Sequence, residues 1–150
     1  MKYKTLGAIK GVQNVPYCKA AEDMRVGMGV ILDRVAKTAS LPAGNVQDVT
    51  YIVTNINDKP ECGNTAEATL VLKDEFVRAD DLRTVTGLEA EFSADEITTT
   101  YDTLAVGDEL VFGADGKLVK GASAGYAIFF KVIAMTAYMD GGVLVEICGE

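Results

Sequence analysis

The chain has 150 residues, of which 49% are apolar and 24% are charged; these values exclude a disordered tail and predict one domain over residues 1–150. There are 22 acidic and 14 basic residues, so the net charge of −8 argues against nucleic acid or an anionic membrane as a partner. Histidine is absent, which excludes the histidine-based catalytic triads and the commonest proton shuttle near neutral pH.

The first sixteen residues, 1–16, are mildly basic and precede the first clear strand. We interpret them as an extended N-terminal arm that becomes ordered only against a neighbouring molecule. No apolar run near the start is long enough for a signal peptide, and none elsewhere is long enough for a membrane span. The sequence therefore predicts a soluble protein that is made in a cytosol.

Beyond the arm, turn residues recur at short intervals and separate runs rich in Val, Ile, Thr, Tyr and Phe. In chain order these runs are residues 30–32, 49–56, 70–72, 110–112, 127–133 and 143–147. Such a pattern predicts an all-β fold, mainly antiparallel, built as a small sandwich or barrel with Gly-rich hairpins. At most one or two short helices are expected.

Acidic residues concentrate between positions 74 and 96. They are Asp74-Glu75, Asp80-Asp81, Glu89, Glu91 and Asp95-Glu96. Paired carboxylates can bind Ca²⁺ or act as an acid and a base, but no D-x-D-x-D-G loop is present. We therefore interpret residues 58–100 as an inserted segment with a solvated acidic face.

Within that segment the sequence leaves the secondary structure undecided in one stretch and indicates a helix start in another. Residues 66–82 are open between strand and helix: residues 68–72 favour a strand, whereas residues 73–82 could form a short acidic helix. Residues 93–96 have the spacing of a helix capping box. Because the β-branched run 97–101 is a poor helix former, one turn at most should follow.

Two hairpins close the chain. Asp115-Gly116 lies between the apolar runs 110–112 and 118–119, and Asp-Gly in this setting is a strong hairpin signal. A second turn separates residues 132–138 from the run 143–147. Alternate residues of that last run are apolar, so one face of the strand should be buried.

One stretch of the sequence resembles a second stretch further along the chain. Residues 26–32 resemble residues 106–112, and a lysine follows each copy, Lys37 and Lys117. Tyr-led apolar runs come next, at 51–53 and at 126–128. The unit would be a Gly turn followed by three strands, and two units could form the halves of one sandwich or barrel. Whether this is a true repeat is left open by so short a similarity.

Other candidates for chemistry have plainer interpretations. The glycines in 26–29 and 121–125 match no phosphate-binding motif and predict β turns. The cysteines Cys18, Cys62 and Cys148 are odd in number and form no C-x-x-C motif, which argues against a disulfide framework. Without histidine to activate them, they are interpreted as buried or incidental thiols.

An aromatic and methionine cluster occupies residues 126–139. Its members are Tyr126, Phe129-Phe130, Met135, Tyr138 and Met139. It could be core, line a pocket or form an apolar contact with a partner subunit. Neighbouring side chains of a strand face opposite ways, so one residue of the Phe pair should point away from the core.

Two stretches carry a resemblance to a known family. Residues 20–32, AAEDMRVGMGVIL, resemble the opening of the small capsid-decoration proteins of tailed bacteriophages. Residues 104–112, LAVGDELVF, with 115–119, DGKLV, are similar to that family's second characteristic stretch. In those proteins a V-G-D-x-[LV] turn precedes a hairpin and a closing strand like residues 142–147. The matching positions are turn glycines and strand apolars, so no binding residues are carried over.

The resemblance implies an accessory virion structural protein without enzymatic activity, cofactor, catalytic residue or metal site. It would bind the outside of the lattice formed by the major capsid protein and stabilise the head, as a homo-oligomer for which a trimer is favoured. It would lie on the capsid exterior after synthesis in the host cytoplasm. Two alternatives stay open: another phage assembly module (tail, head-fibre or anchoring β domain), and a small-ligand binder or enzyme that uses carboxylates.

Overall fold

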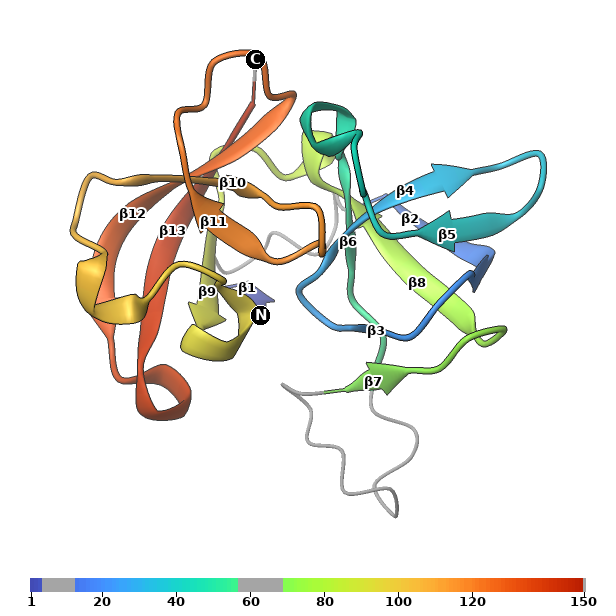
Figure 1. Ribbon diagram of the computed structural model, residues 1–150, viewed down its shortest axis with the longest axis horizontal. Coiled ribbons are helices and arrows are strands. Elements are labelled where there is room, and N and C mark those ends of the chain that lie inside the picture. Colours follow the sequence, from blue (N-terminus) through green and yellow to red (C-terminus); the bar gives the residue numbers. More distant parts are fainter. Residues whose placement is uncertain (4–12, 57–68, 150) are drawn as a thin grey trace.

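The computed structural model describes residues 1–3, 13–56 and 69–149, which form two β lobes (Figure 1). The strands of the first lobe are β2 (Asn14–Ala20), β4 (Gly29–Asp33), β5 (Thr38–Ser40), β6 (Tyr51–Val53) and β8 (Phe76–Asp81), with β3 (Met24–Arg25) and β7 (Leu70–Val71) beside them. Those of the second are β1 (Lys2–Tyr3), β9 (Glu89–Ser93), β10 (Glu109–Phe112), β11 (Leu118–Lys120), β12 (Ile128–Thr136) and β13 (Gly142–Gly149).

All helical elements in the described residues are single 3-10 turns. They are η2 (Val46–Asp48), η4 (Leu82–Thr84), η5 (Ala94–Glu96), η6 (Tyr101–Thr103) and η7 (Tyr138–Asp140). The predicted all-β fold is therefore confirmed. The first lobe is a closed barrel with the strand order β2-β5-β4-β6-β8, and the second is a sheet with the order β1-β9-β13-β12-β10-β11.

Both predicted hairpins are present. Strands β10 and β11 pair antiparallel around Asp115-Gly116, where Gly116 has a φ of +77° that favours glycine. Strands β12 and β13 form a long antiparallel ladder with a bulge between Val132 and Ala134. Along β13 the expected alternation holds, because Val143, Val145 and Ile147 are buried while Glu146 is exposed.

The two lobes repeat one arrangement of strands. The order β5-β4-β6-β8-β2 in the first lobe matches β11-β10-β12-β13-β9 in the second, with the strands in the same sequence along the chain. The turn before the first hairpin makes the same bonds twice: Gly27 N–H donates to Val53 O at 3.0 Å, and Gly107 N–H donates to Val132 O at 2.8 Å. The return bond from each valine measures 2.9 Å in both lobes.

The way in which each lobe closes is also repeated. In the first lobe β2 and β5 pair in parallel, and Ala21 N–H donates to Ala39 O at 2.8 Å. In the second lobe Ile97 forms a parallel bridge with Leu118, and Thr98 N–H donates to Leu118 O at 2.7 Å. The repeat of the fold is thus longer than the echo in the sequence and covers a whole five-strand unit.

Strand register corrects one detail of the expected repeat. Tyr51 lies opposite Val30, and Phe130 lies opposite Leu110 in the corresponding pair of the second lobe. Tyr51 therefore corresponds to Phe130, and the expected match with Tyr126 is wrong. Ser40, opposite Ile31, corresponds to Val119, opposite Val111, and eleven positions then lead to Tyr51 in one lobe and to Phe130 in the other. The spacing is therefore the same in both lobes, and the length difference that a match of the two Tyr-led runs requires does not exist.

The lobes share a core. Val49 and Ile52 of the first lobe belong to the same buried cluster as the interior of the second sheet. At its centre Phe130 meets Phe92 and Phe112 edge-to-face, with ring centroids 5.5 Å and 5.2 Å apart. A second cluster fills the barrel with smaller side chains, mainly valine, alanine and Cys18.

Two predicted segments are different in the structure. Both described ends of residues 1–16 belong to sheets: β1 pairs with β9, and β2 begins at Asn14; residues 4–12 lie outside the described residues. In the predicted insertion 58–100, the described part supplies β8 and β9, each of which lies between two other strands. That part is therefore integral to both lobes, while residues 58–68 lie outside the described residues.

The described part of the open segment 66–82 contains two strands, β7 and β8, while residues 66–68 lie outside the described residues. Strand β8 pairs with β2 on one side and with β6 on the other, and its alternate residues Val77, Ala79 and Asp81 face the interior of the barrel. Hydrogen bonding on both edges overrides the weak helical preference of this acidic sequence. The single turn expected after Ser93 is confirmed as η5, with its capping box.

We predict that Gly29→Ala destabilises the protein by about 1–3 kcal/mol, because the junction of the lobes has no room for a methyl group. A Cβ at this position would lie 2.5–2.8 Å from atoms of the Phe112 ring, and Gly29 N–H also donates to Gly116 O of the other lobe at 2.7 Å. Urea denaturation measures the change. Gly44→Ala is the matched control, since a Cβ there meets nothing within 4 Å, and equal losses in both variants would contradict the prediction.

Candidate functional site

The acidic residues between 74 and 96 do not form one solvated face, which corrects the sequence interpretation. Asp80, Asp81 and Glu91 are buried, with 3%, 7% and 4% of their surface exposed. Glu96 caps η5: its Oε2 accepts hydrogen bonds from Ser93 N–H at 2.7 Å and from Ser93 Oγ at 3.1 Å. Within residues 1–3, 13–56 and 69–149, no group of three or more His, Cys, Asp or Glu side chains is placed to hold a metal ion.

The two described cysteines lie in different lobes. Cys18 is fully buried inside the first barrel, and Cys148 is half-buried near the end of β13. Burial raises the pKa of both thiols, so both are weaker nucleophiles at neutral pH than a free cysteine. This agrees with their interpretation as incidental thiols, while Cys62 lies outside the described residues.

The glycine-rich stretches are turns, as predicted. Gly27 has a φ of +90° and Gly125 a φ of +84°, both in the left-handed region. Gly27 also lies against the second lobe, because a Cβ there would come within 2.1 Å of Glu96 Oε1. The glycine therefore allows the turn before β4 to approach η5 closely, and the lobes meet there.

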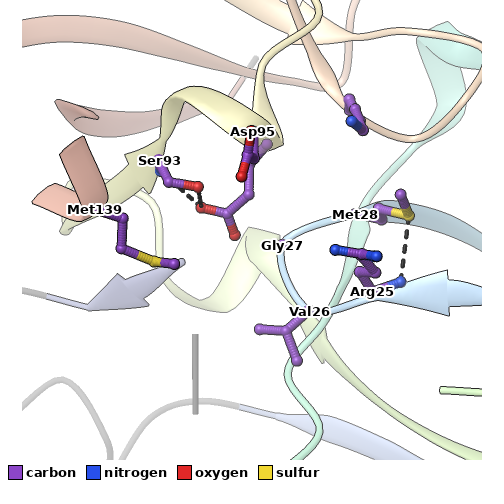
Figure 2. A pocket seen from close by; sticks show the side chains of 9 residues that line it. Arg25, Val26, Gly27, Met28, Ser93, Asp95 and Met139 are labelled. Atoms are coloured by element: carbon purple, nitrogen blue, oxygen red, sulfur yellow. Dashed lines mark hydrogen bonds between the residues drawn. The ribbon is translucent and has the colours of Figure 1, made fainter. Parts of the chain in front are cut away.

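A pocket of about 390 Å³ opens at this meeting of the lobes (Figure 2). Arg25, Val26 and Met28 of the first lobe lie on one side, with Ser93 and Asp95 of the second lobe across from them. The remaining lining residues are Gly27, Glu96, Lys117 and Met139. Two cationic and two acidic side chains line the space, so its charges balance.

The acids of this pocket are partly engaged in holding the fold. Both oxygens of Glu96 accept hydrogen bonds, one from Ser93 and the other from the amino group of Met1. Glu96 therefore does not supply one of the two converging acids that the alternative of a carboxylate-based binder or enzyme requires. Arg25, Lys117 and Asp95 give the pocket a mixed polar rim that could hold a small zwitterion.

A second polar cluster lies in the first lobe, and sequence reasoning missed it. We call it the barrel mouth and define it by Arg34, Tyr51, Asp81 and Arg83. Tyr51 belongs to the core of the barrel, and its hydroxyl accepts hydrogen bonds from Arg34 Nη2 and, at 3.2 Å, from Arg83 Nη2. Both guanidinium carbons lie 5.7 Å from the centroid of its ring. Two cations thus converge on one phenol.

Arg83 also holds Asp81 in a two-pronged contact. Its Nε donates to Asp81 Oδ1 at 2.9 Å and its Nη2 donates to Asp81 Oδ2 at 2.7 Å, while its backbone N–H donates to Oδ1 at 3.1 Å. These bonds hold the pKa of Asp81 below its usual value, although burial opposes them. Arg34, Tyr51 and the Asp81–Arg83 pair come from three separate segments of the sequence, and no local motif signals their meeting.

The aromatic and methionine cluster is divided between core and surface. Phe130 is fully buried and Phe129 is half-buried on the opposite face of β12, as strand geometry predicted. Ile133 at the bulge is 37% exposed and Val106, beside Val132, is 63% exposed. Leu144, half-buried, lies opposite Ala134, the residue that follows Ile133. We call Ile133, Leu144 and Val106 the outer apolar patch; the exposed Lys131, opposite Glu146, separates Phe129 from it along β12.

Comparison with known proteins adds no relative to these observations. No family model matches the chain, and no curated protein matches its sequence. Among the residues that the structure describes, no helix has the length and apolar character needed to cross a membrane. The function is therefore argued from the patch, the pocket and the barrel mouth themselves.

We predict that the Asp81–Arg83 contact stabilises the fold at neutral pH and loses its effect in acid. Because the pKa of Asp81 is lower in the folded state than in the unfolded state, the contribution is complete above the unfolded-state value and disappears as the pH falls through the folded-state value. The difference in free energy of unfolding between the wild type and Asp81→Asn should therefore be largest at about pH 7 and smaller at about pH 2.5, which lies below the usual pKa of an aspartate.

Denaturant titrations at the two pH values test this, with Asp48→Asn, an exposed aspartate on η2, as the control for removal of a charge. A gap between the wild type and Asp81→Asn that stays constant across this range would contradict the prediction.

Proposed function

We propose that this chain is an accessory structural protein of a virion, which binds the outer surface of a capsid lattice and stabilises the head. The observation that carries the proposal is the outer apolar patch, in which Ile133 and Val106 are exposed on a framework of paired strands. Apolar side chains gathered on a rigid sheet are suited to contact with another protein surface. The major capsid protein is the proposed partner, as the resemblance of residues 20–32 and 104–119 implies.

The framework under the patch supports a role that depends on shape. Strands β12 and β13 are paired from Ile128 opposite Gly149 to Thr136 opposite Gly142, and β10 and β9 flank them. The β-bulge interrupts the β12–β13 ladder between Val132 and Ala134, and the side chain of Ile133 in the bulge is exposed. Such a surface is formed before binding, so little conformational entropy is lost when it meets a lattice, and many weak contacts on one lattice add up to firm attachment.

The acids with displaced pKa values also favour binding over catalysis. The pKa of Asp108 is lowered by hydrogen bonds from Lys120 and from Ala105 N–H, and the pKa of Glu109 is lowered by Ser123. Asp108 lies 2.7 Å from Lys120 Nζ. Carboxylates held ionised in this way strengthen loops of the fold, whereas a general acid requires a raised pKa.

A second candidate function rests on the pocket between the lobes. Its volume of about 390 Å³ and its lining of both charge signs, with Arg25, Lys117 and Asp95, favour a small zwitterionic ligand, such as a free amino acid. In that case the protein would be a small-ligand binder, and the outer apolar patch would be incidental. Calorimetry with a panel of free amino acids separates the two candidates.

We predict that Ile133→Asp abolishes attachment to heads while the protein stays folded, because a carboxylate on the patch would be desolvated on contact. Co-sedimentation with DNA-filled heads of the phage that encodes the chain measures attachment. Ile56→Asp is the matched control: Ile56 is 73% exposed, more than Ile133, and lies in the other lobe. Attachment by Ile133→Asp at the wild-type level would contradict the proposal, and co-purification with isolated tails would favour a tail module.

The proposed assembly also predicts an oligomer, for which a trimer is favoured. Size-exclusion chromatography with light scattering should give three times the mass of the chain. A stable monomer that does not attach to heads would contradict the proposed function and return attention to the pocket.

A further inference from the structure

The repeat of the fold shows which features of the first lobe its architecture does not require. Strand register matches Tyr51 to Phe130, and it matches Asp81, opposite Tyr51, to Ile147, opposite Phe130. Phe130 and Ile147 are buried core residues, with 0% and 1% of their surface exposed. The same place in the same arrangement of strands is therefore filled by apolar side chains in one lobe and by polar ones in the other.

Polar groups at such a place are costly. A hydroxyl and a carboxylate that leave water must be compensated by hydrogen bonds, and an apolar pair of similar volume commonly stabilises a fold at least as well. In the first lobe the compensation comes from Arg83 and Arg34, two further residues. Since the second lobe closes without any of this, we attribute the barrel mouth to a binding role.

The two arginines of the mouth are not equally engaged. Arg83 donates two hydrogen bonds from its guanidinium to Asp81, whereas Arg34 makes one hydrogen bond to the described residues, and this bond goes to Tyr51. In the described stretches of the chain, no carboxylate lies within ion-pair distance of Arg34. A guanidinium has five N–H donors, so Arg34 retains a planar edge for a further acceptor.

The turn that carries Arg34 is well ordered by local bonds. Asp33 Oδ1 accepts hydrogen bonds from the backbone N–H groups of Val35 and Ala36, both at 2.8 Å. Val35 is 95% exposed at the tip of the β4–β5 hairpin, which projects from the first lobe on the side away from the second (Figure 1). Arg34 is therefore exposed beside an apolar residue at the tip of the hairpin, and its guanidinium is positioned by the hydrogen bond to the Tyr51 hydroxyl.

We propose that the barrel mouth binds a carboxylate side chain of a partner protein. Arg34 would hydrogen-bond this carboxylate in the way that Arg83 hydrogen-bonds Asp81. A carboxylate matches the flat, two-pronged edge of a guanidinium, and the apolar tip at Val35 fits a partner segment in which apolar residues flank the acid. A polyanion such as nucleic acid is disfavoured by the net charge of −8. The site adds detail to the proposed function. Only the identification of the partner as a capsid protein rests on that function.

Tyr51 is a positioning residue in this proposal, because it acts through Arg34. The second lobe shows that phenylalanine fits the equivalent place, so Tyr51→Phe should fold with nearly the wild-type stability. Loss of the hydroxyl releases Arg34 from its hydrogen bond, and binding of the carboxylate should weaken. A purely structural role for the hydroxyl would lower the stability instead and leave binding unchanged.

The test uses the whole chain and a blocked synthetic peptide of alternating leucine and glutamate as the probe. We expect the peptide to shift the Arg34 side-chain N–H signal in NMR spectra, and Arg34→Gln to lose at least about tenfold in affinity. Arg34→Lys keeps the charge but not the forked guanidinium, so its affinity for the peptide should lie between those of the wild type and Arg34→Gln. Lys37→Gln, on the same hairpin, is the matched control and should bind like the wild type.

Three outcomes would overturn the proposal: equal affinity for a peptide with glutamine in place of glutamate, unchanged affinity in Arg34→Gln, or inorganic phosphate displacing the peptide at equimolar concentration. Co-sedimentation separates this site from the proposed function. If Arg34→Gln binds heads normally, the mouth is not the capsid contact; if the wild type binds the peptide but not heads, the site stands and the virion role fails.

Discussion

The structure depends on the close apolar contact between the two lobes. Ile52 of the first lobe packs into the core around Phe112 and Phe130, and Gly29 leaves just enough room for the Phe112 ring. A five-strand unit of this size has a small interior of its own, and the barrel of the first lobe is filled largely by valine and alanine. Packing the units together creates a larger core than either could bury alone, which is the main source of favourable free energy in a domain of this length.

The two lobes share one backbone arrangement but differ in the side chains that fill and cover it. One fold can therefore carry two kinds of surface. Hydrogen bonds at the turns of Gly27 and Gly107 and the parallel closures at Ala39 and Leu118 are the same in both lobes. Backbone pairing needs few particular side chains, so it survives changes inside the lobe. The second lobe has an aromatic core and an outer apolar patch, whereas the first has small core residues and the polar mouth around Tyr51.

These surfaces lie on different parts of the molecule, and this placement fits a protein that joins others. The outer apolar patch belongs to strands β12 and β13 and to the turn before β10. The barrel mouth belongs to the first lobe, with the β4–β5 hairpin at its far end (Figure 1). Apolar contact supplies most of the free energy of association, while an Arg–carboxylate pair supplies orientation and selectivity. The proposed role on a capsid requires both, because the protein would have to select one lattice and bind to it in many copies.

The sequence by itself determined the all-β class, the hairpin at Asp115-Gly116 and the alternation of the last strand, Gly142–Gly149. These are local properties: turn chemistry and a two-residue period act over a few neighbours, so they can be read from the chain. Only the tertiary structure decided that residues 76–81 form a strand paired on both edges, and that Tyr51 corresponds to Phe130. The barrel mouth belongs to this second kind, because Arg34, Asp81 and Arg83 meet at Tyr51 through strand register, which depends on hydrogen bonds between distant segments.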